Sequence, residues 1–350
     1  MRGAKQFGAA TKLLGALVVA GLALTGPLAG AGHASHSDPR PNTTFSWYMN
    51  TTSETVLYDM GCAHGNRIAA DNDPRNPLTI LDFGKPVKIG ADYGADLPGV
   101  AGTRTLTEIR KGAQAFFQGM FTCLPSGMRS SVSAKVSIGV NNDFPVPWVN
   151  TDANDFGHDY AVMVNNANGF LSDTGMNAAG NFNAGVDFEL AWSSPGMARA
   201  MTNGYKSGPG GFFVFNFGDA QGCQWFGTGD EHSCGSAAFP QWDSEDVHYV
   251  SYGSGQSKAY PEIYREDGVT AEEWVLVSKW GIDHGFAAMD VTGPLTQHRA
   301  CHSDPGRLSV CNAGNTDNTS AEGWDDMVNK MDARPSTIDD MLYSSDIDWH

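Results

Sequence analysis

The sequence predicts an α/β protein built as a (β/α)8 TIM-like barrel. Eight short runs rich in β-branched and aromatic residues recur along the chain, most of them end in polar residues, and segments of helical period separate many of them. Eight parallel strands are the number that closes such a barrel. The predicted strands are residues 55–61, 78–84, 134–140, 183–190, 211–218, 247–253, 259–264 and 286–292.

Four segments between these runs are predicted helices. Residues 105–121 have the clearest helical spacing, with apolar side chains at Leu106, Ile109, Ala113, Phe116, Phe117 and Met120. Segments 193–205 and 270–281 show the same period more weakly. Residues 158–171 are locally ambiguous, but the third and fourth strands need a crossover, which favours a helix there. Only five residues separate the sixth and seventh runs, so we expect an irregular barrel at that point.

The first 34 residues are predicted to be a signal peptide. Basic residues precede the apolar run LLGALVVAGLAL, and small residues follow it up to Ala34. The glycines interrupt this run, and no other stretch is long enough to span a bilayer. We therefore expect a secreted protein with no membrane span after signal removal.

The rest of the chain is divided into an N-terminal extension (35–54), a glycoside-hydrolase-like barrel (55–300) and an acidic C-terminal segment (301–350) packed on the barrel. Removing residues 1–34 leaves 19 Lys and Arg against 39 Asp and Glu, a net charge of about −20. This sign disfavours nucleic acid as a partner. The sequence makes no prediction of the oligomeric state.

Six cysteines in an exported chain favour disulfide bonds. Spacing suggests that Cys223 pairs with Cys234 and Cys301 with Cys311, which would leave Cys62 with Cys123. Fifteen pairings of six cysteines are nevertheless compatible with the sequence.

The carboxyl ends of barrel strands form the active-site mouth, so the polar residues that close each run are the candidate site. Carboxylates and amides predominate among them: Asp59, Asp82, Asn141, Asp187, Glu189, Asn216, Asp219 and Asp290. Two-residue alternation in the fourth strand sends Phe182, Ala184, Val186, Phe188 and Leu190 to one face. Asp187 and Glu189 then share the inward face about 6 to 7 Å apart, where burial costs free energy unless a ligand meets them.

Two neighbouring acids of unequal burial can divide into a proton donor and an ionised partner, as glycoside hydrolysis requires. Glu189 is the candidate acid, Asp187 would stabilise positive charge or orient the substrate, and Asp59 is a third catalytic candidate. The carboxylates could instead be paired with basic or backbone donors. The spacing leaves the stereochemical outcome open.

Aromatic side chains near strand ends support a sugar ligand, since their faces stack on pyranose rings. Trp148, Trp192, Tyr252 and Tyr264 are in such positions. The predicted substrate-binding residues are Asp82, Asn141, Asn216, Tyr252, Trp192 and Asp290. No pair among His64, His158 and His284 has a metal-like spacing with a third ligand, so we expect no metal and no cofactor. No G-x-S-x-G elbow is present.

Several of these segments together, GVDFELAW, FFVFNFGDAQGC, YVSYGSGQSKAYPEIY and FAAMDVTGPLTQ, resemble a group of secreted bacterial glycoside-hydrolase-like TIM barrels. That group is in turn distantly similar to the lysozyme-type muramidases of glycoside hydrolase family 25. The resemblance covers most of residues 55–297. It implies that the Asp-x-Glu pair of the family's fourth strand corresponds to Asp187 and Glu189, and the acid of its first strand to Asp59. The opening YDMGCAHG departs from that of an active muramidase.

Two functions fit these observations. The first is a secreted glycoside hydrolase that acts on polysaccharide or peptidoglycan of the cell wall or environment. The alternative is a non-catalytic barrel that binds glycan or a surface partner.

Overall fold

The computed structural model describes residues 40–71, 77–224, 234, 241–338 and 341–350. The predicted signal peptide, residues 1–34, and the start of the extension lie outside this range. Within it, eight parallel strands form one curled sheet in the order β10-β11-β1-β2-β6-β7-β8-β9. These strands are β1 (Thr44–Tyr48), β2 (Leu78–Asp82), β6 (Ala134–Asn141), β7 (Gly180–Asp187), β8 (Val214–Asn216), β9 (Ser257–Ala259), β10 (Leu295–Thr296) and β11 (Ser345–Trp349).

The sheet is open between its edge strands. In the described ranges β9 and β10 do not pair as a ladder; two isolated bridges connect this region, one from Ala259 at the end of β9 to Val291 and one from Glu262, after β9, to Leu295 of β10. The predicted α/β fold with eight parallel strands is therefore confirmed, but the sheet is a curled half-barrel instead of a closed TIM barrel. We expected the irregularity between the sixth and seventh predicted strands, at residues 254–258, whereas the sheet opens after β9.

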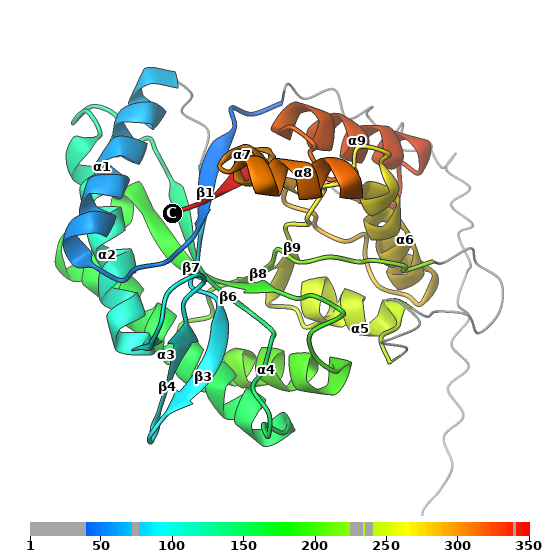
Figure 1. The fold of residues 1–350 in the computed structure, drawn as a ribbon, viewed down its shortest axis with the longest axis horizontal. Coiled ribbons are helices and arrows are strands. Elements are labelled where there is room, and N and C mark those ends of the chain that lie inside the picture. The colour runs from blue at the N-terminus through cyan, green and yellow to red at the C-terminus, as the bar shows by residue number, and fades with distance from the viewer. Residues whose placement is uncertain (1–39, 72–76, 225–233, 235–240, 339–340) are drawn as a thin grey trace, which may run out of the picture. The chain divides into compact units, whose positions relative to one another are not determined.

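Helices lie around the sheet, as Figure 1 shows. The long helices α2, α3, α4 and α6 occupy the four segments predicted to be helical. The helices are α1 (Glu54–Asp71), α2 (Leu106–Cys123), α3 (Asn150–Asp173), α4 (Pro195–Ser207), α5 (Ser244–His248), α6 (Val269–Asp283), α7 (His298–His302), α8 (Pro305–Gly314) and α9 (Ser320–Ala333), with a 3-10 turn at Asn177–Ala179 and a π turn at Tyr249–Gly253.

Two predicted strands are helical. Residues 55–61 belong to α1, whose buried side chains recur at Leu57, His64 and Ile68 over 18 residues, a longer period than the local run of β-formers. Residues 247–253 lie in α5 and the π turn, behind a capping box of Asp243 and Asp246. Residues 286–292 form isolated bridges only.

The two ends of the described chain meet in adjacent strands near one edge of the sheet. β1 pairs in parallel with β11 along five residues, from Thr44 opposite Ser345 to Tyr48 opposite Trp349. Figure 1 shows the C-terminus beside β1. The segment expected to pack on the barrel surface therefore also supplies a strand inside the sheet, and the N-terminal extension supplies its neighbour.

The interior of the curl is apolar below the strand ends. One buried cluster fills it and is contributed by β2, β8, β10, β11 and the segments that follow β8 and β9 and precede β11. Its members are Leu78, Ile80, Phe215, Phe217, Tyr260, Leu295, Tyr343 and Ile347. This layer separates the bottom of the sheet from the polar mouth above it.

Close helix packing and disulfides stabilise the outer layer. α1 and α2 approach so closely that a Cβ on Gly119 would lie 2.0 Å from the carbonyl oxygen of Tyr58. The structure contains the three disulfides that spacing suggests, Cys62–Cys123, Cys223–Cys234 and Cys301–Cys311. Such bonds are typical of exported proteins. None of the helices in the described ranges has the length and apolar character that crossing a membrane requires.

A small antiparallel sheet follows β2 and stands beside the mouth. It consists of β3 (Lys85–Ile89), β4 (Asp92–Asp96) and β5 (Thr103–Thr105). Tyr93 anchors it to the α3 region through edge contacts with Trp148 and Phe156, at ring-centroid distances of 5.5 and 5.8 Å. This small sheet connects β2 to the rim of the candidate site.

Candidate functional site

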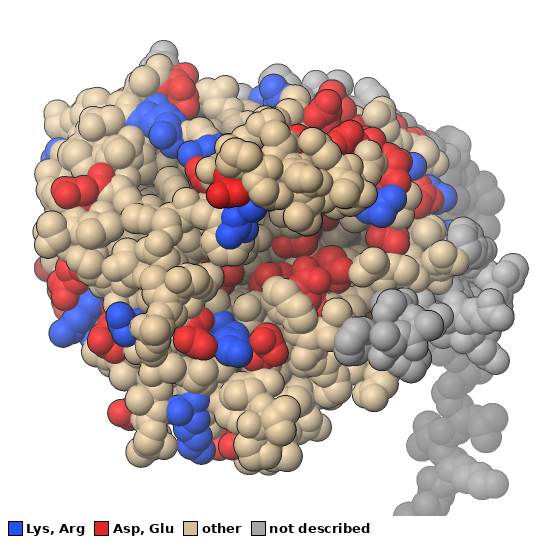
Figure 2. Space-filling model, viewed as in Figure 1, with Lys and Arg blue, Asp and Glu red and all other residues tan. Residues whose placement is uncertain are grey.

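A cleft of about 570 Å³ opens at the carboxyl ends of the parallel strands. Figure 2 shows acidic side chains gathered in a hollow in the middle of this face. Five carboxylates and four large aromatics line the cleft: Asp82, Asp96, Asp187, Glu189, Glu262, Tyr48, Trp192, Tyr264 and Trp349. The volume lies within the range of small-ligand sites.

Strand β7 supplies the two acids on which the sequence prediction centres. Asp187 is its last residue, opposite Asn141 of β6, and Glu189 follows two positions later. The alternate residues of this strand face the helices, where Phe182 packs on Phe117 of α2 at 5.3 Å between ring centroids. Alternation therefore directs both acids into the cleft.

Glu262 completes a cluster of three carboxyls with this pair. It follows β9, and one carboxylate oxygen from each of Asp187, Glu189 and Glu262 lies within 4.8 Å of the other two. The Tyr264 hydroxyl donates a hydrogen bond of 2.7 Å to Glu262 Oε1 and lies 3.4 Å from the hydroxyl of Tyr48. We call Asp187, Glu189 and Glu262 the acid cluster.

Burial and mutual repulsion favour the protonated forms of the acid cluster. Burial and then the charge of Asp219 raise the pKa of Glu189 to about 8, and a hydrogen bond with Glu262 partly offsets this rise. The pKa of Asp187 is raised well above its ordinary value by burial and then by Glu189. The pKa of Glu262 rises for the same reasons, burial first and then Asp187. At neutral pH the cluster therefore retains protons.

Two neighbouring carboxyls titrate at lower pH. Burial raises the pKa of Asp82 to about 6, although the Gly84 amide donates to its Oδ1 at 3.0 Å. Burial also raises the pKa of Asp219 to about 6, against hydrogen bonds from the backbone of Leu190 and Gln221. At pH 7 both are mostly ionised, so proton donors and negative charges lie side by side in the site.

No basic side chain in the described ranges forms an ion pair with the acid cluster. Lys85, at the rim, pairs instead with Asp143 at 3.7 Å. The Oδ1 atom of Asp187 is buried and has no hydrogen-bond partner in the part of the chain that the structure describes. The cluster therefore has unused hydrogen-bonding capacity for a ligand. When ionised, its three oxygens could also hold a hard divalent cation.

Aromatic faces border the acids. Trp192 is 43% exposed at the cleft. Tyr48 and Trp349 stack with ring centroids 4.4 Å apart, and the guanidinium of Arg307 lies 3.8 Å from the Trp349 ring centre. Exposed aromatic faces beside carboxylates are suited to sugar rings, which present apolar faces and polar edges.

The structure gathers five of the predicted site residues in the cleft: Asp82, Asn141, Asp187, Glu189 and Trp192. It does not bring the other four there. Asp59 is exposed on α1, and Asp290 pairs with Lys258. Asn216 is buried, where it donates to the Ser251 hydroxyl at 2.8 Å. Tyr252 lies in the π turn against His248.

Sequence reasoning missed Glu262, Tyr48 and Trp349 as site residues. For Glu262 a signal existed, because two-residue alternation through AYPEIY places Tyr260, Glu262 and Tyr264 on one face. Tyr48 and Trp349 belong to β1 and β11, which were not predicted as strands. No family model, curated protein or solved structure matches the chain.

Proposed function

We propose that the chain is a secreted glycoside-hydrolase-like protein that hydrolyses glycosidic bonds in cell-wall or environmental polysaccharide. The single observation that carries this proposal is the acid cluster, which retains protons and has no basic partner among the described residues, in a cleft bordered by aromatic faces. Peptidoglycan is one proposed substrate, in keeping with the sequence resemblance to family 25 muramidases and their TIM-like barrels. The three disulfides support export.

In this proposal Glu189 is the general acid. A carboxyl with a pKa of about 8 is protonated at neutral pH and can transfer its proton to the glycosidic oxygen as the bond to the anomeric carbon breaks. A second carboxyl of the cluster must first release its proton to water, and the positive charge that develops on the sugar ring then favours its ionised form. Asp187 is placed to stabilise that charge, and Tyr264 holds Glu262 beside it.

The separation within the acid cluster bears on stereochemistry. Carboxylate oxygens within 4.8 Å of one another leave no room for a water molecule between acid and base, as an inverting enzyme needs. A retaining reaction instead uses a second carboxylate as nucleophile at about 5 to 5.5 Å. The cluster therefore favours retention, with Asp187 or Glu262 as the nucleophile.

The experiment that tests the proposal compares the mature protein with Glu189→Gln and with the matched control Glu266→Gln. Glu266 is exposed and outside the cleft. Each protein is incubated with peptidoglycan and a panel of polysaccharides, and new reducing ends are assayed. We expect release by the parent and the control and at least 100-fold less by Glu189→Gln, whose amide cannot donate the proton.

Binding measurements distinguish the proposed hydrolase from a non-catalytic glycan-binding barrel. Pull-down on the same polymers should show that Glu189→Gln retains the parent's affinity. Retained binding with no release by the parent would overturn hydrolysis and favour the non-catalytic glycan-binding barrel. Equal loss of release in Glu189→Gln and Glu266→Gln would show that Glu189 has no special role.

A further inference from the structure

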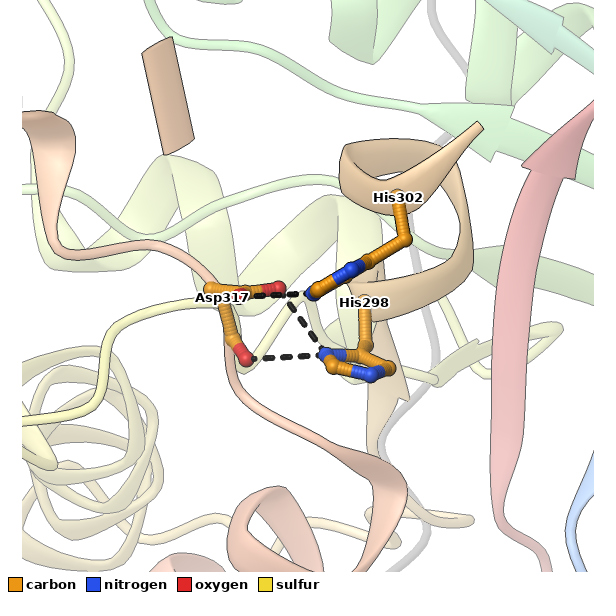
Figure 3. Close-up of side chains that lie close together, drawn as sticks. All are labelled: His298, His302 and Asp317. Carbon is orange, nitrogen blue, oxygen red and sulfur yellow. Dashed lines mark hydrogen bonds and ion pairs between the residues drawn. The ribbon is translucent and has the colours of Figure 1, made fainter. Parts of the chain in front are cut away.

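Two histidines and an aspartate converge outside the cleft. His298 and His302 are the first and last residues of α7, four positions apart and therefore on one face. Asp317 lies between α8 and α9, and its two carboxylate oxygens are 2.9 Å from His298 Nδ1 and 3.0 Å from His302 Nε2. Figure 3 shows both rings directed at this one carboxylate.

We propose that His298, His302 and Asp317 form a zinc site. One donor atom from each residue lies within 4.8 Å of the other two, and the imidazole rings are 4.2 Å apart between centroids. Two imidazole nitrogens and one carboxylate oxygen are a ligand set that zinc prefers, with a fourth position left for water. The inference does not depend on the proposed glycosidase function, since none of the three residues lines the cleft.

The backbone holds the three ligands in place. Cys301 lies between the two histidines and is bonded to Cys311 of α8. The carbonyl of Thr316, next to Asp317, accepts a hydrogen bond of 3.2 Å from the side chain of Gln297. The amide of Thr316 in turn donates to the carbonyl of Cys311 at 3.0 Å. The disulfide and these bonds therefore connect α7 to the aspartate segment before any ion binds.

Asn318 holds the chain on the other side of Asp317 in place. The amide of Asn318 donates to the carbonyl of Tyr264 at 3.2 Å, and its side chain donates to the carbonyls of Ile263 and Arg265 at 3.2 and 2.8 Å. Because Asp317 is held on both sides, binding of an ion requires little ordering of the chain. A bound ion would also tie α7 to the segment that carries Tyr264 into the cleft.

Exposure of the three side chains permits metal entry. The side chains of His302 and His298 are 45% and 35% exposed, whereas that of Asp317 is 14% exposed. Because the Asp317 carboxylate lies beneath the two accessible imidazoles, a zinc ion bound among them would be open to water on one side only. This arrangement fits three protein ligands and one exchangeable ligand.

The test uses untagged mature protein with its disulfides intact, stripped with chelator and titrated with zinc chloride by calorimetry. We expect one high-affinity zinc per chain, and a tetrahedral visible absorption band when cobalt(II) replaces zinc. His302→Gln and His298→Gln should each weaken zinc binding by on the order of 100-fold or more, since loss of even an outer partner of a ligand costs 10- to 100-fold. The matched control is His158→Gln, which replaces an exposed histidine on α3 and should bind zinc as the parent does.

Circular dichroism of each variant establishes that it is folded. Failure of the parent to bind zinc above background would overturn the proposal. So would equal binding by the parent and folded His302→Gln, which would mean an adventitious ion only. If one histidine variant fails to fold, the other and Asp317→Asn provide the same comparison.

Discussion

Replacing Glu189 by Gln should change how the protein's stability depends on pH. The pKa of Glu189 is raised from 4.5 to about 8 in the folded protein, chiefly by burial. A carboxyl group whose pKa is higher in the folded protein than in the unfolded chain contributes stability to the folded state. This stability is fully present below the pKa of the unfolded chain and is lost as the pH rises through the pKa of the folded protein. Gln cannot ionise, so the variant avoids this loss.

The size of the effect follows from the two pKa values. At about 1.4 kcal/mol for each factor of ten, the penalty for ionising Glu189 reaches roughly 3 kcal/mol at pH 7 and roughly 5 kcal/mol at pH 9. These values are upper limits, because Glu189 is partly exposed and water in the cleft stabilises its ionised form. The penalty belongs to the whole acid cluster, since burial and the neighbouring acids also raise the pKa values of Asp187 and Glu262.

Urea unfolding at pH 5, 7 and 9 measures this difference in the free energy of unfolding. Glu189→Gln should match the parent at pH 5 within about 1 kcal/mol and exceed it increasingly at pH 7 and 9, with unchanged m-values. Glu266→Gln should follow the parent at all three pH values. Parallel curves for the parent and Glu189→Gln, within about 0.5 kcal/mol from pH 5 to 9, would refute the electrostatic account of the cluster.

Four further predictions follow from packing, crosslinks and the cleft. Gly119→Ala should destabilise the protein by about 1–3 kcal/mol in urea unfolding, because its Cβ would meet the Tyr58 carbonyl, whereas Gly127→Ala has open space and should be neutral. Removing Cys62–Cys123, which spans 61 residues, should cost about 4 kcal/mol against about 3 kcal/mol for Cys301–Cys311, which spans 10; the reverse order by chemical denaturation would contradict the chain-entropy estimate. Trp192→Ala should weaken glycan binding by about 2- to 10-fold while leaving stability nearly unchanged, as calorimetry and urea unfolding would show. Proton NMR of the first product should show retention at the anomeric carbon; immediate inversion would exclude a nucleophilic carboxylate in the acid cluster.

The central strands could be predicted because they are buried on both faces. β2 and β8 lie in nearly continuous apolar runs, β6 and β7 alternate apolar residues with small or polar ones, and the long helices between the strands carry an apolar period. The first predicted strand was wrong. In residues 55–61 a short run of β-formers suggested a strand, whereas the period that continues through Ile68 belongs to a helix.

The last strand could not be recognised because its acids are neutralised by distant residues. β11 has the sequence SDIDW, and polar, acidic runs are typical of exposed segments. In the fold, Asp346 accepts a hydrogen bond from the amide of Arg299, and Asp348 pairs with the guanidinium of Arg299 at 2.7 Å. These contacts cross about fifty residues, which local pattern does not reveal.

The residues of the candidate site could likewise be predicted only where they lie on recognisable strands. Asp187 and Glu189 could be placed together because both lie on one face of a recognisable strand. Tyr48 and Trp349 could not, since they enter the cleft only through the pairing of the two end strands. The four-residue spacing of His298 and His302 was visible in the sequence, but Asp317 joins them only through the fold.

Hydrolysis in ¹⁸O-labelled water tests the central claim most directly. Fragments released from a responsive polymer would be analysed by mass spectrometry for label at the new reducing end. The account predicts one ¹⁸O atom per cleaved bond, at the anomeric carbon, from the parent and from Glu266→Gln but not from Glu189→Gln. Unlabelled fragments, or equal labelled release by Glu189→Gln, would contradict acid-catalysed hydrolysis by this cleft.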